Sequence, residues 1–376
     1  MKYKLNFIDV ELEKLKQNNL YRKLRYVKSH GAHITINQKK LLNLCSNDYL
    51  GIPTTKIQIN QLQSSSRLVS GNDESYKKLE DVLSKHKSQE SSLIYPTGYM
   101  ANLGAISSIA KKGDLILSDE LNHASIIESC KLSDARIIIY KHNDMKDLRK
   151  KLKQSGKSKF VITEGVFSMD GDFASLDQIT EITEKSNAIT VVDDAHGDFV
   201  IGSDGKGTPN HFRVSKKIDM YVSSLSKGLG SFGGYIASKN NVVDLCINKS
   251  KSFIYTSALP SFLVEYSLKR IKSNREKQRK VLENNIKQLS HGLRQIGYEV
   301  NSNTHIIPLI IGNEKAAIDF GEFLFSNGVF AQPIRYPTVP KNQARLRISV
   351  TAWLSHTDIE RTLEVLDKAY QRFMNK

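Results

Sequence analysis

Residues 189–197 read ITVVDDAHG, a largely apolar run that closes on two aspartates and a histidine. Runs of similar character stand at 115–117, 135–140, 160–164 and 220–223, and helix-like stretches at 125–132, 145–154 and 176–185 lie between them. This alternation predicts a parallel sheet with helices on both faces. Ligands bind at the carboxyl ends of the strands in such sheets, so we expect the polar residues that close these runs to form a site.

Lys227 follows one of these runs, in the order Ser224-Leu225-Ser226-Lys227-Gly228. A lysine with a partly buried stem has a lowered pKa, and its neutral amine forms Schiff bases with carbonyl compounds. Asp193, which closes the run at 189–193, suits a protonated pyridine nitrogen such as that of pyridoxal phosphate (PLP). The alternatives are a surface lysine in a turn and an aspartate that caps a helix beside a structural histidine. A metal ion would also suit Asp193, but no ligand cluster supports one, so we expect no metal.

Three further motifs each have a functional and a structural interpretation. Gly228-x-Gly230-x-x-Gly233 matches a dinucleotide fingerprint in form, but a strand-like segment follows it where a helix is required, which argues against NAD. Gly98 and Tyr99 open a helix whose free N–H groups suit a phosphate, or they form a plain cap. His123 also opens a helix, where its ring either stacks on a flat aromatic group or caps the helix.

Composition narrows the class of protein. The chain has 376 residues and a net charge of +16, with lysines spread along it and acidic residues between them. We therefore expect a solvated basic surface and no nucleic-acid site, although a nucleic-acid-binding protein on a retained enzyme fold stays open as an alternative. No apolar run is long enough for a membrane helix, and three distant cysteines favour a reducing compartment, the cytoplasm.

The flanks differ from the middle of the chain. We expect an amphipathic helix over about 10–24, a long helix over about 268–295, and then an α+β pattern with strands at 306–311 and 346–350. The predicted domains are an N-terminal helix and β segment (1–45), a large domain (46–265) and a smaller C-terminal α+β domain (266–376).

Taken together, the motifs resemble the α-oxoamine synthases, PLP enzymes of fold type I, over almost the whole chain. The resemblance lies in SNDYLG at 46–51, RLVSG at 67–71, NHAS at 122–125, EGVFSMDG at 164–171, DDAH at 193–196, SKG at 226–228, YTSALP at 255–260 and ARLRI at 344–348. It implies a mostly parallel, helix-covered sheet in the large domain, PLP as cofactor, and a homodimer with composite sites.

The resemblance also implies roles for individual residues. Lys227 would be the Schiff-base lysine and proton shuttle, Asp193 the partner of the pyridine nitrogen, and His196 the partner of the ring hydroxyl. The other implied cofactor contacts are His123 on the ring face, Gly98 and Tyr99 beside the cofactor, Ser168 near the ring hydroxyl, Ser224 at the phosphate, and Thr256 and Ser257 at the phosphate of the other subunit. The implied substrate contacts are Arg347 on the amino-acid carboxylate, together with Asn47, Thr338 and Arg22, with Arg25 as the alternative to Arg22.

Three segments favour one branch of the family, namely 67–72, 140–144 and 337–340. That branch condenses L-alanine with a pimeloyl thioester, carried on CoA or on a carrier protein. Glycine-using members, of the 2-amino-3-oxobutyrate CoA ligase or 5-aminolevulinate synthase type, are the alternative. The chain departs from the family pattern at 64–66 and at 197–199, where Gly-Asp-Phe replaces the commoner Ala-Thr-Gly.

Overall fold

The computed structural model describes residues 4–54, 56–57, 59 and 64–374. Within this part the chain divides into two compact units. Unit 1 combines residues 1–46, 169–171 and 280–376, and unit 2 combines residues 47–168 and 172–279. Each unit is described by itself below.

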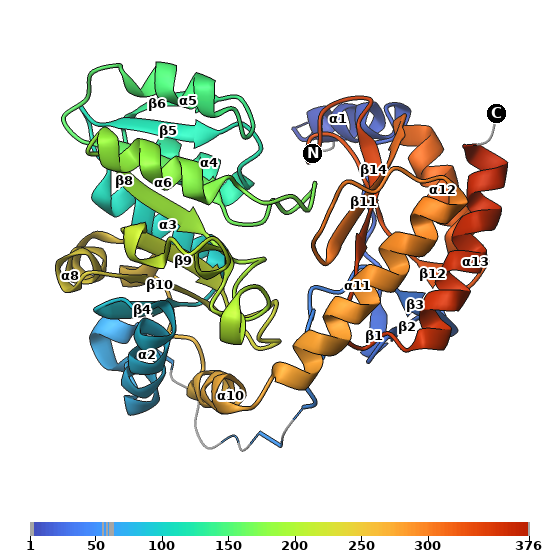
Figure 1. The fold of residues 1–376 in the computed structure, drawn as a ribbon, viewed down its shortest axis with the longest axis horizontal. Helices are drawn as coiled ribbons and strands as arrows, with labels where there is room; N and C mark the ends of the chain where they lie inside the picture. Colours follow the sequence, from blue (N-terminus) through green and yellow to red (C-terminus); the bar gives the residue numbers. More distant parts are fainter. Residues whose placement is uncertain (1–3, 55, 58, 60–63, 375–376) are drawn as a thin grey trace. The chain divides into compact units, whose positions relative to one another are not determined.

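Unit 2 is built on a seven-stranded sheet in the order β4-β10-β9-β8-β7-β5-β6 (Figure 1). The strands are β4 (Ser91–Tyr95), β5 (Leu115–Asp119), β6 (Arg136–Tyr140), β7 (Lys159–Glu164), β8 (Ile189–Asp193), β9 (Met220–Ser224) and β10 (Gly234–Ser238). Neighbouring strands from β9 to β6 pair in parallel, whereas β10 is antiparallel to both of its neighbours. The predicted mostly parallel sheet is therefore confirmed.

Helices follow most strands of unit 2, as the alternating pattern predicts. They are α2 (Glu74–Lys87), α3 (Gly98–Ile109), α4 (Ala124–Leu132), α5 (Met145–Leu152), α6 (Leu176–Lys185), α7 (Thr208–His211), α8 (Asn240–Lys249), α9 (Lys251–Ile254) and α10 (Ser261–Lys272). Short helical turns lie at Arg67–Gly71, Ser203–Gly205 and Ser215–Lys217.

The two faces of the sheet are distinguished by the alternation of side chains along each strand. On β8, Val191 belongs to an apolar core that also contains Ala105 of α3 and Ile126 of α4. Thr190 points to the other face, where its hydroxyl donates to Thr183 of α6 at 2.8 Å. Helices α3 and α4 thus cover one face and α6 covers the other, as predicted from the sequence.

Unit 1 contains two small sheets. One has the order β1-β2-β3-β12 and the other β11-β14-β13. The strands are β1 (Val27–His30), β2 (His33–Ile36), β3 (Lys39–Asn43), β11 (Ile306–Gly312), β12 (Val329–Phe330), β13 (Pro333–Ile334) and β14 (Ala344–Ser349). The helices of unit 1 are α1 (Asn6–Gln17), α12 (Glu314–Ser326), α13 (His356–Phe373) and most of α11 (Glu276–Ile296).

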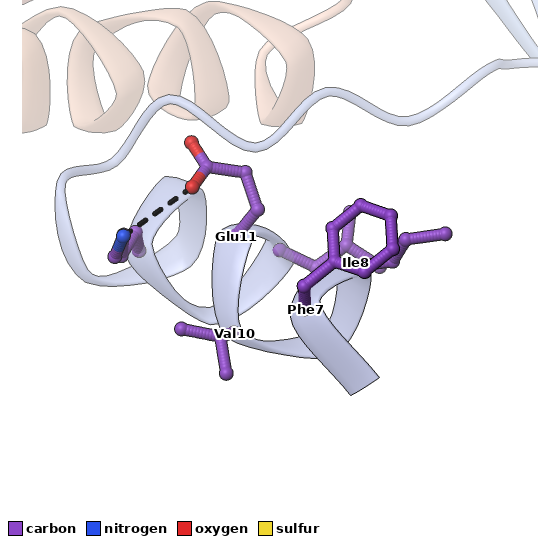
Figure 2. A pocket seen from close by; sticks show the side chains of 6 residues that line it. Phe7, Ile8, Val10 and Glu11 are labelled. Carbon is purple, nitrogen blue, oxygen red and sulfur yellow. Dashed lines mark hydrogen bonds and ion pairs between the residues drawn. The ribbon is translucent and has the colours of Figure 1, made fainter. Parts of the chain in front are cut away.

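Two predicted helices were wrong in extent. The first helix spans Asn6–Gln17 rather than 10–24, because the chain turns at Asn19, whose φ is +57°. None of its residues is buried, and Figure 2 shows Phe7, Ile8 and Val10 on its surface.

The expected single helix at 268–295 is two helices, α10 and α11. Ser273 has extended backbone angles, and the side chain of Asn274 accepts from the N–H of Glu276 at 2.9 Å, which begins the second helix.

Within the described residues, no helix is both long and apolar enough to cross a membrane.

Candidate active site

Most of the predicted site residues of unit 2 gather at the carboxyl edge of its sheet. Asp193 ends β8 and Ser224 ends β9, and Lys227 lies three residues beyond Ser224. Gly98 begins α3 directly after β4, and His123 is the N-cap of α4 after β5. Because parallel strands end at the same edge, these residues meet although the sequence separates them.

Lys227 contacts a short chain of hydrogen bonds. Its Nζ lies 2.9 Å from Nε2 of His196, and Nδ1 of His196 lies 2.7 Å from the hydroxyl of Tyr49. Tyr49 donates its single proton to Oδ1 of Asn47 at 3.0 Å. Nδ1 of His196 must then carry a proton and donate to Tyr49, which leaves Nε2 as an acceptor facing Lys227.

Asp193 is buried on the face of the sheet that α3 covers. Its Oδ2 accepts from Nδ2 of Asn102 at 2.6 Å, and its Oδ1 accepts from the N–H of Ala195 at 3.0 Å. Both of these donors are neutral groups.

Glu164 is a second buried carboxyl group beside Asp193. Burial and the negative charge of Asp193 raise the pKa of Glu164 well above its usual range. Its Oε2 accepts from the N–H of Ser168 at 3.3 Å, whereas its Oε1 has no hydrogen-bond partner among the described residues.

The imidazole of His123 caps α4, and its Nδ1 lies 2.7 Å from the hydroxyl of Ser125. Desolvation by the surrounding protein lowers the pKa of His123, against the opposing attraction of Asp193. His123 is also in edge contact with Tyr99, with ring centroids 6.3 Å apart. The structure thus supports both the capping interpretation and a neutral ring available for stacking.

The N-terminus of α3 forms a cradle with the end of β9. Thr97 caps the helix by accepting from the N–H of Met100. A Cβ at Gly98 would lie 3.2 Å from Cβ of Ser224, so only glycine lets the helix come this close without displacing that strand end. Free helix N–H groups beside the Ser224 hydroxyl favour an anion.

The remaining predicted residues are distributed over both units. Ser168 is buried four residues after Glu164, and Thr256 and the exposed Ser257 lie in the loop between α9 and α10. Arg22, Thr338 and Arg347 belong to unit 1. There Arg22 donates to the carbonyl of Tyr336 at 3.3 Å, and Arg347 donates to the Ser349 hydroxyl at 2.8 Å. The alternative residue, Arg25, packs its guanidinium over Phe325 and Phe330.

Sequence reasoning named no role for Tyr49, Asn102 or Glu164, which the structure brings to the site. Tyr49 and Glu164 lie inside two of the quoted motifs, SNDYLG and EGVFSMDG. The sequence does not show their contacts, because the partners are far apart in the chain, by 147 residues for Tyr49 and by 91 for Asn102.

The residues present fit PLP. A lysine amine suits the aldehyde, a buried carboxylate suits the protonated pyridine nitrogen, and the cradle at Gly98 suits the phosphate. Within the described residues, no group of three or more His, Cys, Asp or Glu side chains is arranged to hold a metal ion.

A sheet of this topology with a lysine just beyond one strand and an aspartate ending the next points to one class of enzyme. Residues 39–366 match the family model of aminotransferase class I and II, and the chain belongs to that family. The predicted PLP fold type I is thereby confirmed.

Individual relatives narrow the comparison. The chain is 40% identical over 381 residues to 8-amino-7-oxononanoate synthase of Thermoanaerobacter pseudethanolicus, which covers 97% of this chain and 96% of that protein. Further relatives that match over nearly their full length, at 36–38% identity, carry the same name.

Solved structures agree with this. Serine palmitoyltransferase of Sphingomonas wittichii superposes with a TM-score of 0.91 at 28% identity, over 99% of this chain and 98% of that one. A serine palmitoyltransferase variant from S. paucimobilis with a bound PLP–myriocin aldimine has a TM-score of 0.91 at 25% identity, over 99% of both chains. These relatives are α-oxoamine synthases, so the resemblance drawn from the motifs is confirmed.

Proposed function

We propose that this protein is a PLP-dependent α-oxoamine synthase that condenses L-alanine with a pimeloyl thioester. The net reaction yields 8-amino-7-oxononanoate, CO2 and the free thiol of CoA or of a carrier protein, a step of biotin synthesis. The observation that carries this proposal is the pairing of Lys227 with His196 at 2.9 Å, beside the buried carboxylate of Asp193. The full-length relatives named 8-amino-7-oxononanoate synthase support the choice of substrates.

Each site residue has a task that follows from its chemistry. Lys227 would hold PLP through Nζ, and Asp193 would keep the proton on the pyridine nitrogen. His196 would face the ring hydroxyl through Nε2, with Ser168 nearby, and His123 would cover the ring. The cradle of Gly98, Tyr99 and Ser224 would take the phosphate. When bound, PLP supplies an electron sink for the carbanion formed at the amino-acid α-carbon.

Proton transfer is the task of Lys227. Its neutral Nζ would take the α-proton of the amino acid and later return a proton to the product. The acceptor nitrogen of His196 faces this amine, so the structure provides a hydrogen-bond partner for the ammonium form that arises in between.

Substrate recognition is assigned to Arg347, with Asn47, Thr338 and Arg22 near the substrate. An arginine binds a carboxylate through two parallel hydrogen bonds, which orients the amino acid as well as holding it. Asn47 is already tied to the site through Tyr49 and His196.

We further propose a homodimer with composite sites. Tyr255 is 82% exposed, and the neighbouring loop carries Thr256 and Ser257, which the family resemblance assigns to the phosphate of the second subunit. A cytoplasmic location agrees with the state of the cysteines, since Cys45, Cys130 and Cys246 are all free.

The decisive experiment assays purified protein against a matrix of amino acids and acyl thioesters. Alanine with pimeloyl-CoA or a pimeloyl carrier protein should give the highest kcat/KM. One methyl group is worth about 1–3 kcal/mol, so glycine should be weaker by a finite factor. A clear preference for glycine with acetyl-CoA or succinyl-CoA would reassign the protein to the glycine-using branch. A protein that binds no PLP would contradict the enzyme class itself.

A further inference from the structure

A buried lysine lies behind the proposed cofactor site. Lys87 is the last residue of α2, and its side chain has no exposed surface. Its Nζ lies 3.1 Å from Oδ2 of Asp194 and 2.6 Å from Oδ1 of Asp198. One cation therefore joins two carboxylates that are four residues apart in the chain.

This cluster occupies the sheet face opposite Asp193. Asp198 also accepts from the hydroxyls of Ser223 at 2.8 Å and Tyr235 at 2.5 Å. Ser223 alternates along β9 with Val222, which packs in the α3 and α4 core. Because neighbouring side chains of a strand point to opposite faces, the network around Asp198 lies beneath the sheet edge that carries the site.

The two anchored carboxylates lie next to the residues that face the proposed cofactor. Asp194 directly follows Asp193, and His196 lies between Asp194 and Asp198. The N–H groups of Gly197 and Asp198 both donate to the carbonyl of Asp194, at 2.9 and 2.7 Å. The turn is thus closed on itself and attached to α2 at both ends.

We propose that Lys87 is a positioning residue, which holds Asp193 and His196 in place for PLP by tying Asp194 to Asp198. The proposal rests on the proposed function only in its assignment of PLP to this site.

The charges of the cluster agree with this role. Although burial opposes it, attraction to Asp198 and Asp194 raises the pKa of Lys87, so the amine is charged. Burial lowers the pKa of His86, which faces Asp198, so this histidine is neutral near pH 7. Arg275 and Tyr221 also face the cluster. Lys87 is therefore the cation in direct contact with both carboxylates.

Phe199, where the chain departs from the family pattern, packs against the same end of α2. Phe199 has a φ of +65°, which favours glycine. Its ring stacks on His86, with centroids 5.0 Å apart and planes 8° from parallel. His86 and Lys87 thus secure neighbouring positions, Phe199 and Asp198.

The test compares apoproteins carrying Lys87→Met and the double change Lys87→Met/Asp198→Asn. The double variant removes the tie but keeps the net charge of the Lys87, Asp194 and Asp198 group, so it should fold even if the single variant does not. Lys85→Met, an exposed lysine on the same helix turn, is the matched control. The measurements are the thermal midpoint, the PLP dissociation constant by absorbance titration, and hydrogen exchange of the apoprotein.

We expect PLP binding to the double variant to weaken about tenfold or more, the scale seen when groups that orient metal ligands are lost. Exchange should rise at 193–202 and stay unchanged in β5, and Lys85→Met should match the wild type. A double variant with wild-type PLP affinity and exchange, or one with only a lower thermal midpoint, would overturn the proposal. If the wild-type apoprotein bound no PLP, the proposed function would fall, while exchange at 193–202 would still decide the role of Lys87.

Discussion

At the scale of single residues, His196 is oriented by what lies on its two sides. Tyr49 accepts the proton of Nδ1, and Nε2 faces the amine of Lys227. In this tautomer the ring presents an acceptor nitrogen to the amine of Lys227, and the hydrogen bonds that run from Asn47 to Lys227 fix it through the protein's own side chains.

The first prediction at this scale concerns Lys227. Lys227→Ala should abolish turnover, because the amine that binds the carbonyl and moves the α-proton is gone. Borohydride should then no longer link PLP covalently to the protein, which mass spectrometry of the digest can check. Lys216→Ala, an exposed lysine of the same unit, should keep both properties. A reduced PLP adduct mapping to another lysine would show that the assignment is wrong.

A second prediction concerns His142. Its Nδ1 lies 2.9 Å from Asp119 and its Nε2 lies 2.8 Å from Asp172. Desolvation opposes the charge, but the hydrogen bonds to both carboxylates raise the pKa of His142 to about 10. A raised pKa in the folded state gives stability that is fully present below the unfolded value of about 6.5 and is lost as the pH rises towards 10.

His142→Gln removes this charge and should therefore flatten that part of the pH dependence. Thermal midpoints of wild type and variant should differ most near pH 6 and converge by about pH 10. The difference between the two curves therefore reports on the charge of His142. Two curves that stay parallel over this range would contradict a protonated His142.

At the scale of elements, one side chain forms hydrogen bonds with the backbone carbonyls at the break between α10 and α11. Nη1 of the buried Arg275 donates to the carbonyls of Arg270 at 3.0 Å, Ile271 at 2.5 Å and Ser273 at 3.1 Å. The last carbonyls of a helix lack partners within it, and a cation there also opposes the negative end of the helix dipole.

We expect Arg275→Met to lower the free energy of unfolding by about 2–3 kcal/mol, since buried carbonyls lose charged donors. Urea denaturation followed by circular dichroism measures this. Lys272→Met, at an exposed position in the last turn of α10, is the control and should cost far less. Equal losses in the two variants would mean that the capping bonds contribute nothing.

At the scale of the whole molecule, the proposed dimer assigns each site residues from two chains. Lys227 would come from one subunit, and Thr256 and Ser257 from the other. Mutations in the two sets therefore fall on different sites of a mixed dimer, which makes the arrangement measurable.

Mixing inactive Lys227→Ala protein with an inactive Thr256→Ala/Ser257→Ala variant should restore activity, because one site of each heterodimer carries neither change. Random exchange of subunits would restore up to about a quarter of the wild-type activity. Mixing each variant with itself is the control. An active monomer at assay dilution, or no recovery after confirmed exchange, would rule out composite sites.

Much of this protein was determined by local sequence alone. The β-branched runs, the helix starts at Gly98 and His123, and the residues that close β8 and β9 were all predicted, because they depend on periodicity and on neighbours in the chain. The motifs likewise led to the α-oxoamine synthases. The domain limits and the role of each site residue stay predictions.

Tertiary structure decided which side chains meet. Asp193 and Asp194 are adjacent and chemically identical, yet one faces Asn102 of α3 and the other faces Lys87, 107 residues away. That division follows from alternation across a sheet whose strand order and helix placement no local pattern contains. The extent of α1 and the break at Ser273 were misjudged for a related reason, since backbone turns and side-chain caps there override the apolar pattern.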